Sequence, residues 1–376
     1  MPLISHAESA PLAPGLARGP SRAEVIVAIP ARDEEERIEA CLSSLAAQKT
    51  ATPFSVLVLA NNCRDRTVDL VRGLGPNAPF DLHLFDMRLT GSAAHAGMAR
   101  RLAMNAASHL LDEEGVILST DADSRVDVNW VQENLLELHA GADIVCGVIC
   151  PDMAEGALLP SYVHERGLNE FVYERKATEL ETLIDPLPWD PWPRHRMETG
   201  ASLALRAGLY VEVGGVPDIQ PAEDRALVAL ARRHGGTVRH SFGPQVVTSC
   251  RLDGRARGGW ADDLAERVRN PGGICHDVLE PALDFYRRAK WRGAMRRGWP
   301  ALDAAVWGRR LEVAPKLLAG LRQFDFEDAW AEIEAASPLL QRRPLHAPDI
   351  AHETQRMERL LARARALAPV SESEAA

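Results

Sequence analysis

Two aspartates separated by a single residue are the strongest chemical feature of the sequence. Asp121 and Asp123 follow the apolar run 115–120 (GVILST). Side chains at positions i and i+2 of an extended segment point the same way, so both carboxylates could address one divalent cation that also holds a diphosphate. The alternative is a capped turn that leads into a helix at Asn129.

A second polar segment, residues 28–35 (AIPARDEE), directly follows the apolar run 24–30. A turn at this place can receive a nucleotide base or ribose, with Arg32 near a phosphate and a carboxylate near hydroxyl groups. The alternative is a helix with acidic residues in its first turn. Neither GxGxxG nor GxxxxGK[ST] occurs in the chain, so dinucleotide and P-loop phosphate sites are not supported.

A third polar segment, residues 61–67 (NNCRDRT), follows the apolar run 54–60. Asn61 or Asp65 could donate to or accept from a nucleobase. An Asx turn that caps the following helix explains the same residue types.

A fourth group begins with residues 198–208 (ETGASLALRAG) and continues through Gly214-Gly215 to Glu223-Asp224. Adjacent carboxylates that follow a loop offer a general base for an incoming hydroxyl group. The alternative for Asp224 is an ordinary helix N-cap.

The apolar pattern predicts the elements that position these segments. Short β-branched runs alternate with helical spacing, which predicts an α/β fold with a mostly parallel sheet and helices on both faces. Ligands of such sheets bind outside the carboxyl ends of the strands, where the polar segments lie. The predicted strands are 24–30, 54–60, 81–86, 115–120 and 142–150, and the predicted helices are 33–47, 65–73, 93–111 and 129–140.

The second half of the chain is less regular at first and then helical. Residues 151–196 show little periodicity, and 185–196 (DPLPWDPWPRHR) predicts a long loop because it contains four prolines. Regular structure returns at 201–209 and in a helix at 223–234. Only helices are predicted beyond Trp260, at 279–297, 301–324, 327–336 and 350–367. We therefore expect a flexible tail at 1–22, a catalytic domain at 23–260 and a helical extension at 261–376, with a frayed end at 371–376.

In this order and spacing, the four polar segments resemble those of the nucleotide-sugar-dependent family 2 glycosyltransferases. The resemblance covers about residues 23–260. It rests on these segments of the chain: Pro30-Ala31-Arg32-Asp33-Glu34, Ala60-Asn61-Asn62-Cys63-Arg64-Asp65, Ala99-Arg100-Arg101, Asp121-Ala122-Asp123, Gly200-Ala201-Ser202, Gly214-Gly215 and Glu223-Asp224.

The resemblance implies a GT-A-type fold and an inverting transfer. Asp121 and Asp123 would hold Mg²⁺ or Mn²⁺ against the donor diphosphate, and Asp224, next to Glu223, would be the general base. The implied donor-binding residues are Pro30, Arg32, Glu34, Asn61, Asp65, Arg100, Asp121, Arg255 and Arg257. The implied acceptor-binding residues are Gly200, Ala201, Ser202 and Trp260, and loop 151–196 would help to shape the acceptor site.

Three positions depart from the family pattern. Ala60 and Asn61 stand where a pair of acidic residues often contacts uracil or ribose. Thr248 and Ser249 stand where a histidine frequently reaches the metal, and His240 is a nearby candidate for that role. The motif of processive enzymes is represented only by Arg257-Gly258-Gly259-Trp260, so we expect a single transfer rather than polymer synthesis.

Two basic segments follow the fourth group. In 251–259 (RLDGRARGG), glycines permit movement, and Arg255 or Arg257 could close on the diphosphate; a solvated linker is the alternative. Residues 285–300 contain six basic residues between Arg287 and Arg297, interleaved with tryptophans. They could contact an anionic membrane or a lipid-phosphate acceptor, or they could belong to a helix that packs on the catalytic domain.

Composition restricts the remaining choices. The 376 residues carry a net charge of −10, with 22 basic and 34 acidic residues in 1–250 but 21 and 19 in 251–376. An acidic chain argues against nucleic acid as a partner. The six cysteines are scattered, the N-terminus does not resemble a signal peptide, and the sequence has no long apolar run. These features predict a cytoplasmic location, with peripheral contact at the inner membrane face as a further option.

Several alternatives remain open at this stage. The expected partners are a nucleotide diphosphate sugar and an unknown hydroxyl acceptor, which could be a small molecule, a glycan or a lipid-linked compound; a homo-oligomer is also open. A nucleotidyltransferase is a second function, although residues 31–34 (ARDE) lack its usual glycine- and lysine- or arginine-rich loop. A non-catalytic assembly protein on a degenerate transferase fold is a third.

Overall fold

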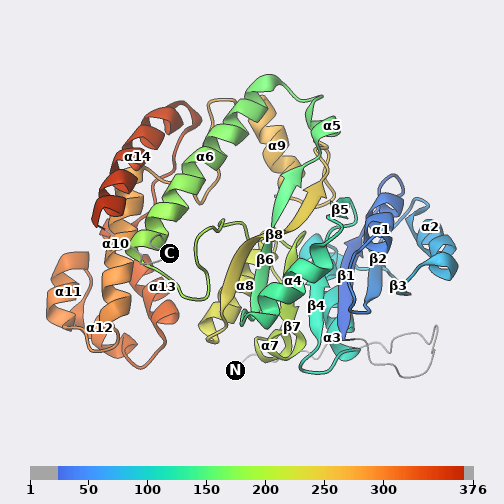
Figure 1. The fold of residues 1–376 in the computed structure, drawn as a ribbon, viewed down its shortest axis with the longest axis horizontal. Helices are drawn as coiled ribbons and strands as arrows, with labels where there is room; N and C mark the ends of the chain where they lie inside the picture. The colour runs from blue at the N-terminus through green and yellow to red at the C-terminus, as the bar shows by residue number, and fades with distance from the viewer. Residues whose placement is uncertain (1–23, 368–376) are drawn as a thin grey trace, which may run out of the picture.

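One mixed sheet forms the centre of the molecule (Figure 1). The computed structural model describes residues 24–367, so the expected tail at 1–22 and the end at 371–376 lie outside the described residues. The strand order is β3-β2-β1-β4-β7-β6-β8-β5. The strands are β1 (Val25–Ala31), β2 (Ser55–Asn61), β3 (Asp81–Met87), β4 (Val116–Ser119), β5 (Ser124–Val126), β6 (Ile144–Pro151), β7 (Leu203–Arg206) and β8 (Val238–Thr248).

The first four strands run parallel, and β6 is parallel to β8. Strand β7 lies antiparallel between β4 and β6, and β5 is antiparallel to β8. In β1 and β2 nearly every side chain is buried because helices cover both faces of the sheet. The predicted α/β fold with flanking helices and a C-terminal helical extension is confirmed.

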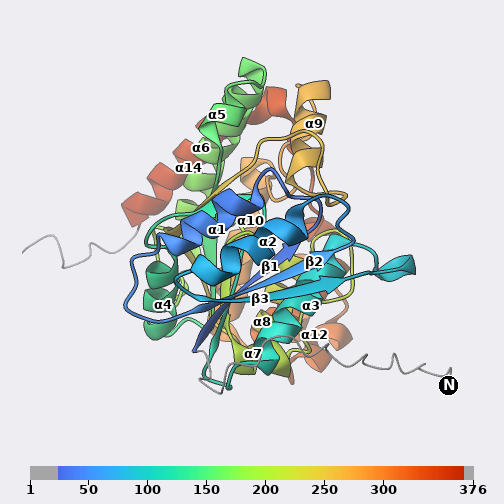
Figure 2. The same cartoon turned by 90° about the vertical axis from the view of Figure 1, so that its right-hand side faces the viewer.

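Helices cover the two faces of the sheet in separate groups (Figure 2). On one face, α1 (Ile38–Ala46), α2 (Thr67–Leu74) and α4 (Trp130–His139) pack on the strands. On the other face lie α3 (Ala96–His109), α7 (Ala207–Glu212) and α8 (Glu223–Arg233). Because β1, β2 and β4 are parallel, their carboxyl ends lie at the same edge of the sheet, and the amino end of α8 lies beside that edge.

The expected helix 33–47 begins later than predicted. Residues 33–37 form turns, and α1 starts at Ile38. Asp33 has a φ of 52°, which is incompatible with a right-handed helix. The amide of Glu34 donates to the Thr67 hydroxyl at 2.8 Å. The acidic residues are therefore held in a turn by contacts with the segment after β2.

Residues 151–196 are more regular than expected. They contain α5 (Met153–Gly156) and the 24-residue helix α6 (Ser161–Ile184), whereas 185–196 is free of helix and strand as predicted. The buried face of α6 includes Arg166, Glu170 and Glu181, which are paired with other charged residues. Because charged residues occupy part of the buried face, the sequence of α6 lacks the apolar periodicity that normally indicates a helix.

The C-terminal part is helical, but its boundaries differ from those expected. The helix α9 (Trp260–Arg269) was not predicted, and 301–324 is divided where Glu312 has a left-handed φ of 55° and Pro315 starts a new helix. Helices α10 and α14 pack against α6, as Figure 1 shows. No helix among the described residues is both long and apolar enough to cross a bilayer. The bounds are α10 (Ala282–Gly298), α11 (Ala304–Leu311), α12 (Pro315–Leu321), α13 (Phe326–Ala336) and α14 (Ile350–Leu367).

Candidate active site

A buried arginine connects the aspartate pair with the carboxylates at the start of α8. Arg100 projects from α3, and its Nη2 donates to Asp121 Oδ1 at 2.8 Å. Its Nε donates to Glu223 Oε1 at 3.1 Å. Its Nη1 donates to Ser119 Oγ at 2.9 Å and to the Gly200 carbonyl at 3.0 Å. Arg100 thus holds residues of three segments that lie far apart in the sequence, at 119–121, 200 and 223.

A Cβ at position 200 cannot be placed unless Arg100 moves, because the guanidinium lies against Gly200. A Cβ placed on Gly200 would lie 2.2 Å from Arg100 Cζ, well inside van der Waals contact. The Gly200 amide donates to Asp224 Oδ2 at 2.8 Å. One short backbone segment therefore contacts both the arginine and the candidate base.

Asp224 and Glu223 occupy different environments at the first turn of α8. Ala222, just before the helix, has a left-handed φ of 73°. Glu223 is buried and paired with Arg100. Asp224 also accepts from the Arg225 amide at 2.8 Å. Burial raises the pKa of Asp224, the charge of Glu223 raises it further, and Arg100 opposes the rise.

A second arginine binds the other aspartate of the pair. Arg251 follows the end of β8, and its two terminal nitrogens donate to the carboxylate of Glu34 at 2.9 and 2.6 Å. Its Nη2 also lies 2.8 Å from Asp123 Oδ2. Burial raises the pKa of Asp123 to about 6; the charge of Asp121 adds to the rise, and Arg251 counteracts it. Asp121 and Asp123 are thus each bound by a different arginine.

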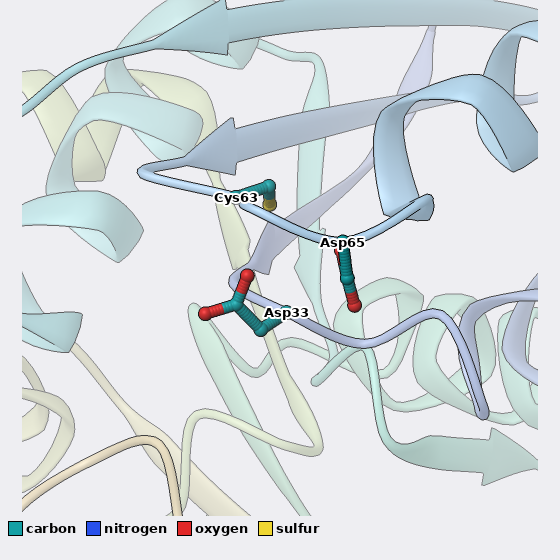
Figure 3. A group of neighbouring side chains, drawn as sticks. All are labelled: Asp33, Cys63 and Asp65. Carbon is teal, nitrogen blue, oxygen red and sulfur yellow. The ribbon is translucent and has the colours of Figure 1, made fainter.

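The residues after β1 and β2 form a neighbouring group, shown in Figure 3. Ligand atoms of Asp33, Cys63 and Asp65 lie within 4.8 Å of one another. Asp65 caps α2 by accepting from the Thr67 amide at 3.0 Å, and Asp33 accepts from the Arg64 amide at 2.7 Å. These carboxylates therefore bind the backbones of the two loops to each other.

Asn61 lies beside this group. Its side chain is buried and donates to the Ala31 carbonyl at 3.2 Å. The side chain of the next residue, Asn62, reaches the segment after β3, where its Nδ2 donates to the Leu89 carbonyl at 2.9 Å. Asn61 and Asp65, both predicted to bind the donor, therefore lie together at the ends of β1 and β2, but each already makes contacts within the protein.

The structure brings only part of the predicted set into the Arg100 cluster. Seven predicted residues lie in this cluster or are joined to it through the Gly200 amide or Arg251: Glu34, Arg100, Asp121, Asp123, Gly200, Glu223 and Asp224. Ser202 is buried, and its hydroxyl accepts from the Trp130 indole at 2.9 Å. Trp260 packs against an apolar group that includes Val163 and Leu264. Of the two loop arginines, Arg257 is exposed, and Arg255 Nε donates to the Asp33 carbonyl at 3.3 Å.

His240 lies away from the aspartate pair. Along β8 it is opposite Cys146, whereas Thr248, eight residues later, pairs with Ser124 beside Asp123. Its Nδ1 lies 2.8 Å from Asp190 Oδ2 in the loop 185–196. This position suits an anchor for the loop and does not suit a metal ligand beside Asp123.

The basic helix α10 uses several of its arginines inside the protein. Arg292 and Arg296 both donate to Asp185 at 2.9 Å, and Arg288 donates to Glu280 at 2.9 Å. These contacts agree with the alternative in which the segment packs against the rest of the chain. Lys290 and Arg287 remain exposed.

Arg251 is the site residue to which sequence reasoning assigned no role. It is the first residue of the glycine- and arginine-rich segment 251–259, in which Arg255 and Arg257 are the predicted donor contacts. Its place shortly after the last strand, at the sheet edge where the other polar segments lie, is the sequence feature that could have indicated a role in the site.

The aspartate pair is suited to a divalent cation that a diphosphate also binds. One oxygen of each aspartate is held by an arginine, which leaves Asp121 Oδ2 and Asp123 Oδ1 for another partner. Carboxylate oxygens suit Mg²⁺ or Mn²⁺, and Mg²⁺ is commonly held by one or two carboxylates together with phosphates. Among residues 24–367, three side-chain ligands gather only at Asp33, Cys63 and Asp65. Phosphate or water would therefore have to complete the coordination at Asp121 and Asp123.

One comparison with known protein families gives a match to the first part of the chain. Residues 26–181 match the family model described as glycosyl transferase family 2. The matched segment contains Arg100, Asp121 and Asp123, whereas Asp224 and Arg251 lie beyond it. No curated protein gives a significant match.

Several solved structures are similar to the chain at low identity. One is TarS 1–349 of S. aureus in complex with UDP-GlcNAc, with 14% identity, a TM-score of 0.45 and coverage of 91% of this chain and 87% of that chain. Another is the mannosyltransferase PcManGT from Pyrobaculum calidifontis in complex with GDP-Man and Mn²⁺, with 17% identity, a TM-score of 0.42 and coverage of 92% and 81%. A third is GalNAc-T7 with UDP, GalNAc and Mn²⁺, with 12% identity, a TM-score of 0.44 and coverage of 85% and 59%.

Proposed function

Because residues 26–181 match the model of glycosyl transferase family 2, we propose that the chain transfers a sugar from a nucleoside diphosphate sugar to a hydroxyl acceptor. The observation that carries this proposal is the position of Arg100. It joins Asp121, on the donor side, to Glu223 and the Gly200 carbonyl, next to the candidate base Asp224. Donor and acceptor groups would therefore be positioned by one buried guanidinium.

The donor diphosphate would bind beside Asp121 and Asp123. Arg100 and Arg251 bind four carboxylates, those of Glu34, Asp121, Asp123 and Glu223, and Asp224 is joined to this group through the Gly200 amide. Five carboxylates outnumber two arginines, so a diphosphate would be repelled without an added cation. A Mg²⁺ or Mn²⁺ ion held by Asp121 and Asp123 would stabilise the negative charge that develops on the leaving nucleoside diphosphate. Arg100 would keep the Asp121 carboxylate oriented toward it.

Asp224 would accept the proton of the attacking hydroxyl group. Its raised pKa makes it a stronger base than an exposed aspartate, and the Gly200 amide orients its carboxylate. Glu223 would position Arg100 instead, since its Oε1 is already bound to Nε of that residue. Direct attack from the face opposite the leaving group gives inversion at the anomeric carbon, and a single transfer per binding event remains the proposal.

The nucleotide would lie over the loops that follow β1 and β2. Pro30, Arg32, Asn61 and Asp65 line the ends of these two strands, and Arg255 is bonded to the same edge through the Asp33 carbonyl. The acceptor would approach the other side of the cluster, along the Gly200 segment. Arg257 remains a predicted donor contact, and Ala201, Ser202 and Trp260 remain predicted acceptor contacts.

A panel of nucleotide sugars tests the function. The experiment measures the thermal shift and product formation for UDP-, GDP-, CDP-, ADP- and dTDP-sugars, each with Mn²⁺, with Mg²⁺ and with EDTA. We expect one donor class to stabilise the protein only with metal. No response to any nucleotide, or full transfer activity in Asp121→Asn, would contradict the proposal.

A further inference from the structure

Arg251 occupies a place at Asp123 that a bound cation would also use. Its side chain is 14% exposed, and its partners Glu34 and Asp123 are 5% and 18% exposed. Three hydrogen bonds or ion contacts of 2.6 to 2.9 Å join the guanidinium to these two carboxylates. In its present position Arg251 therefore neutralises Asp123 from within the protein.

The backbone on the β8 side of Arg251 is anchored, whereas the chain after it is rich in glycine. The Cys250 amide and the Ser249 hydroxyl both donate to Glu155 Oε2 at 2.7 Å. Residues 254, 258 and 259 are glycines, and Gly258 has a φ of 73°. The side chain can therefore exchange partners while its Cα stays at the end of β8.

The guanidinium also has an unused donor. Arg251 Nε is buried and has no hydrogen-bond partner among the described residues. Arginine presents its donors as a planar fork that suits carboxylate and phosphate equally well. A phosphate oxygen near the aspartate pair could therefore replace Asp123 as a partner of this side chain.

We propose that Arg251 is a positioning residue that makes divalent cation binding depend on the nucleoside diphosphate. Without donor, Arg251 remains on Asp123 and Glu34 and opposes a second cation at the same carboxylate. With donor, the diphosphate provides a new anionic partner for Arg251, so Asp123 becomes free to take a metal. This inference rests on the proposed function, because it needs a nucleoside diphosphate at the aspartate pair.

The physical reason is the cost of an unpaired charge in a partly buried site. A metal that bound alone would place two cations beside Asp123 or leave Arg251 without one of its partners. A diphosphate that bound alone would meet the excess of carboxylates. Each ligand removes the penalty of the other, and such coupling is reciprocal: metal tightens nucleotide binding by the same factor as nucleotide tightens metal binding.

The test measures Mn²⁺ binding directly, by electron paramagnetic resonance of free Mn²⁺, so it does not depend on activity. Purified full-length chain is titrated with Mn²⁺ alone and with the nucleoside diphosphate that gives the largest thermal shift among UDP, GDP, CDP, ADP and dTDP. For the wild type we expect at least tenfold tighter Mn²⁺ binding with nucleotide. For Arg251→Gln we expect Mn²⁺ alone to bind at least tenfold tighter than it binds to the wild type, and the effect of nucleotide to fall below threefold.

Two further variants make the result specific. Arg251→Lys keeps the charge but cannot bind both Glu34 oxygens and Asp123 at once, so its Mn²⁺ affinity without nucleotide should lie between those of the wild type and Arg251→Gln. This variant provides the comparison if Arg251→Gln does not fold. Arg269→Gln removes an exposed arginine of α9 that has no predicted part in donor or acceptor binding, and it should behave as the wild type.

The outcomes separate the inference from the function on which it rests. If metal and nucleotide bind together but both Arg251 variants retain the wild-type coupling, the inference is overturned and the glycosyltransferase proposal stands. If the wild type binds Mn²⁺ equally well with and without nucleotide, the inference is also overturned. If no nucleoside diphosphate binds under any condition, both are overturned.

Discussion

Arg100 and Gly200 are in such close contact that position 200 has no room for a side chain. Arg100 Nη1 donates to the Gly200 carbonyl at 3.0 Å, and a Cβ on Gly200 would lie 2.2 Å from Arg100 Cζ. Because the Gly200 amide also binds Asp224, this contact joins the aspartate pair to the candidate base. The geometry of both halves of the site therefore depends on a single buried guanidinium.

Gly200→Ala should displace Arg100 and weaken the site. Overpacking of this kind costs about 1–3 kcal/mol in the free energy of unfolding, which urea denaturation measures. We expect weaker donor binding as well, because Arg100 would lose its position on Asp121. Gly167→Ala is the matched control: its Cβ would meet nothing within 4 Å in α6, so it should stabilise or leave stability unchanged. Equal behaviour of the two variants would argue against the packing role of Gly200.

Asp224→Asn should separate chemistry from binding. Loss of a general base typically lowers turnover about 10²–10⁴-fold, and we expect a fall in kcat in that range with donor affinity changed less than threefold. Steady-state kinetics and calorimetric titration of the donor check this. Asp69→Asn, also in the first turn of a helix but exposed on α2, should keep wild-type turnover. Unchanged turnover in Asp224→Asn would remove that residue from the base role.

Metal-dependent donor binding should weaken in mild acid. Burial raises the pKa of Asp123 to about 6 in the metal-free protein, so the carboxylate takes up a proton below that pH. A metal binds the ionised form, so a proton competes with it, and the affinity should fall by up to about tenfold per pH unit below the pKa. Titrations with Mn²⁺ and nucleoside diphosphate between pH 5 and 7.5 test this. A flat profile over this range would contradict the assignment of Asp123 as a ligand.

Asp190→Asn should loosen the loop 185–196. Asp190 is almost fully buried and contacts His240 Nδ1 at 2.8 Å, Arg239 at 3.2 Å and Arg194 at 3.4 Å. Removal of one partner from a buried charged group typically costs about 3–5 kcal/mol, so the Tm should fall by several degrees. Hydrogen exchange should increase first in 185–196. Glu212→Gln, an exposed substitution at the end of α7, is expected to leave the Tm unchanged.

Local apolar patterns in the sequence determined the first half of the fold. The runs at 24–30, 54–60 and 115–120 correspond to β1, β2 and β4, because a strand covered on both faces has an uninterrupted apolar sequence. The position of Asp121-Ala122-Asp123 directly after one of these runs placed it at the ligand-binding edge of the sheet. The three strands and the place of the aspartate pair depend only on residues that are neighbours in the sequence, so the sequence alone predicts them.

Only the tertiary structure decided which charges meet. Arg251 and Glu34 are 217 positions apart, and Arg100 and Glu223 are 123 apart, so no local pattern links them. The same reason explains two errors in the predicted helices. On the buried face of α6, Glu170 and Glu181 pair with arginines outside the helix. Helix α1 starts late because contacts with Thr67 and Arg251 hold Glu34 in a turn. Apolar burial is visible residue by residue, whereas an ion pair exists only when the fold brings both partners together.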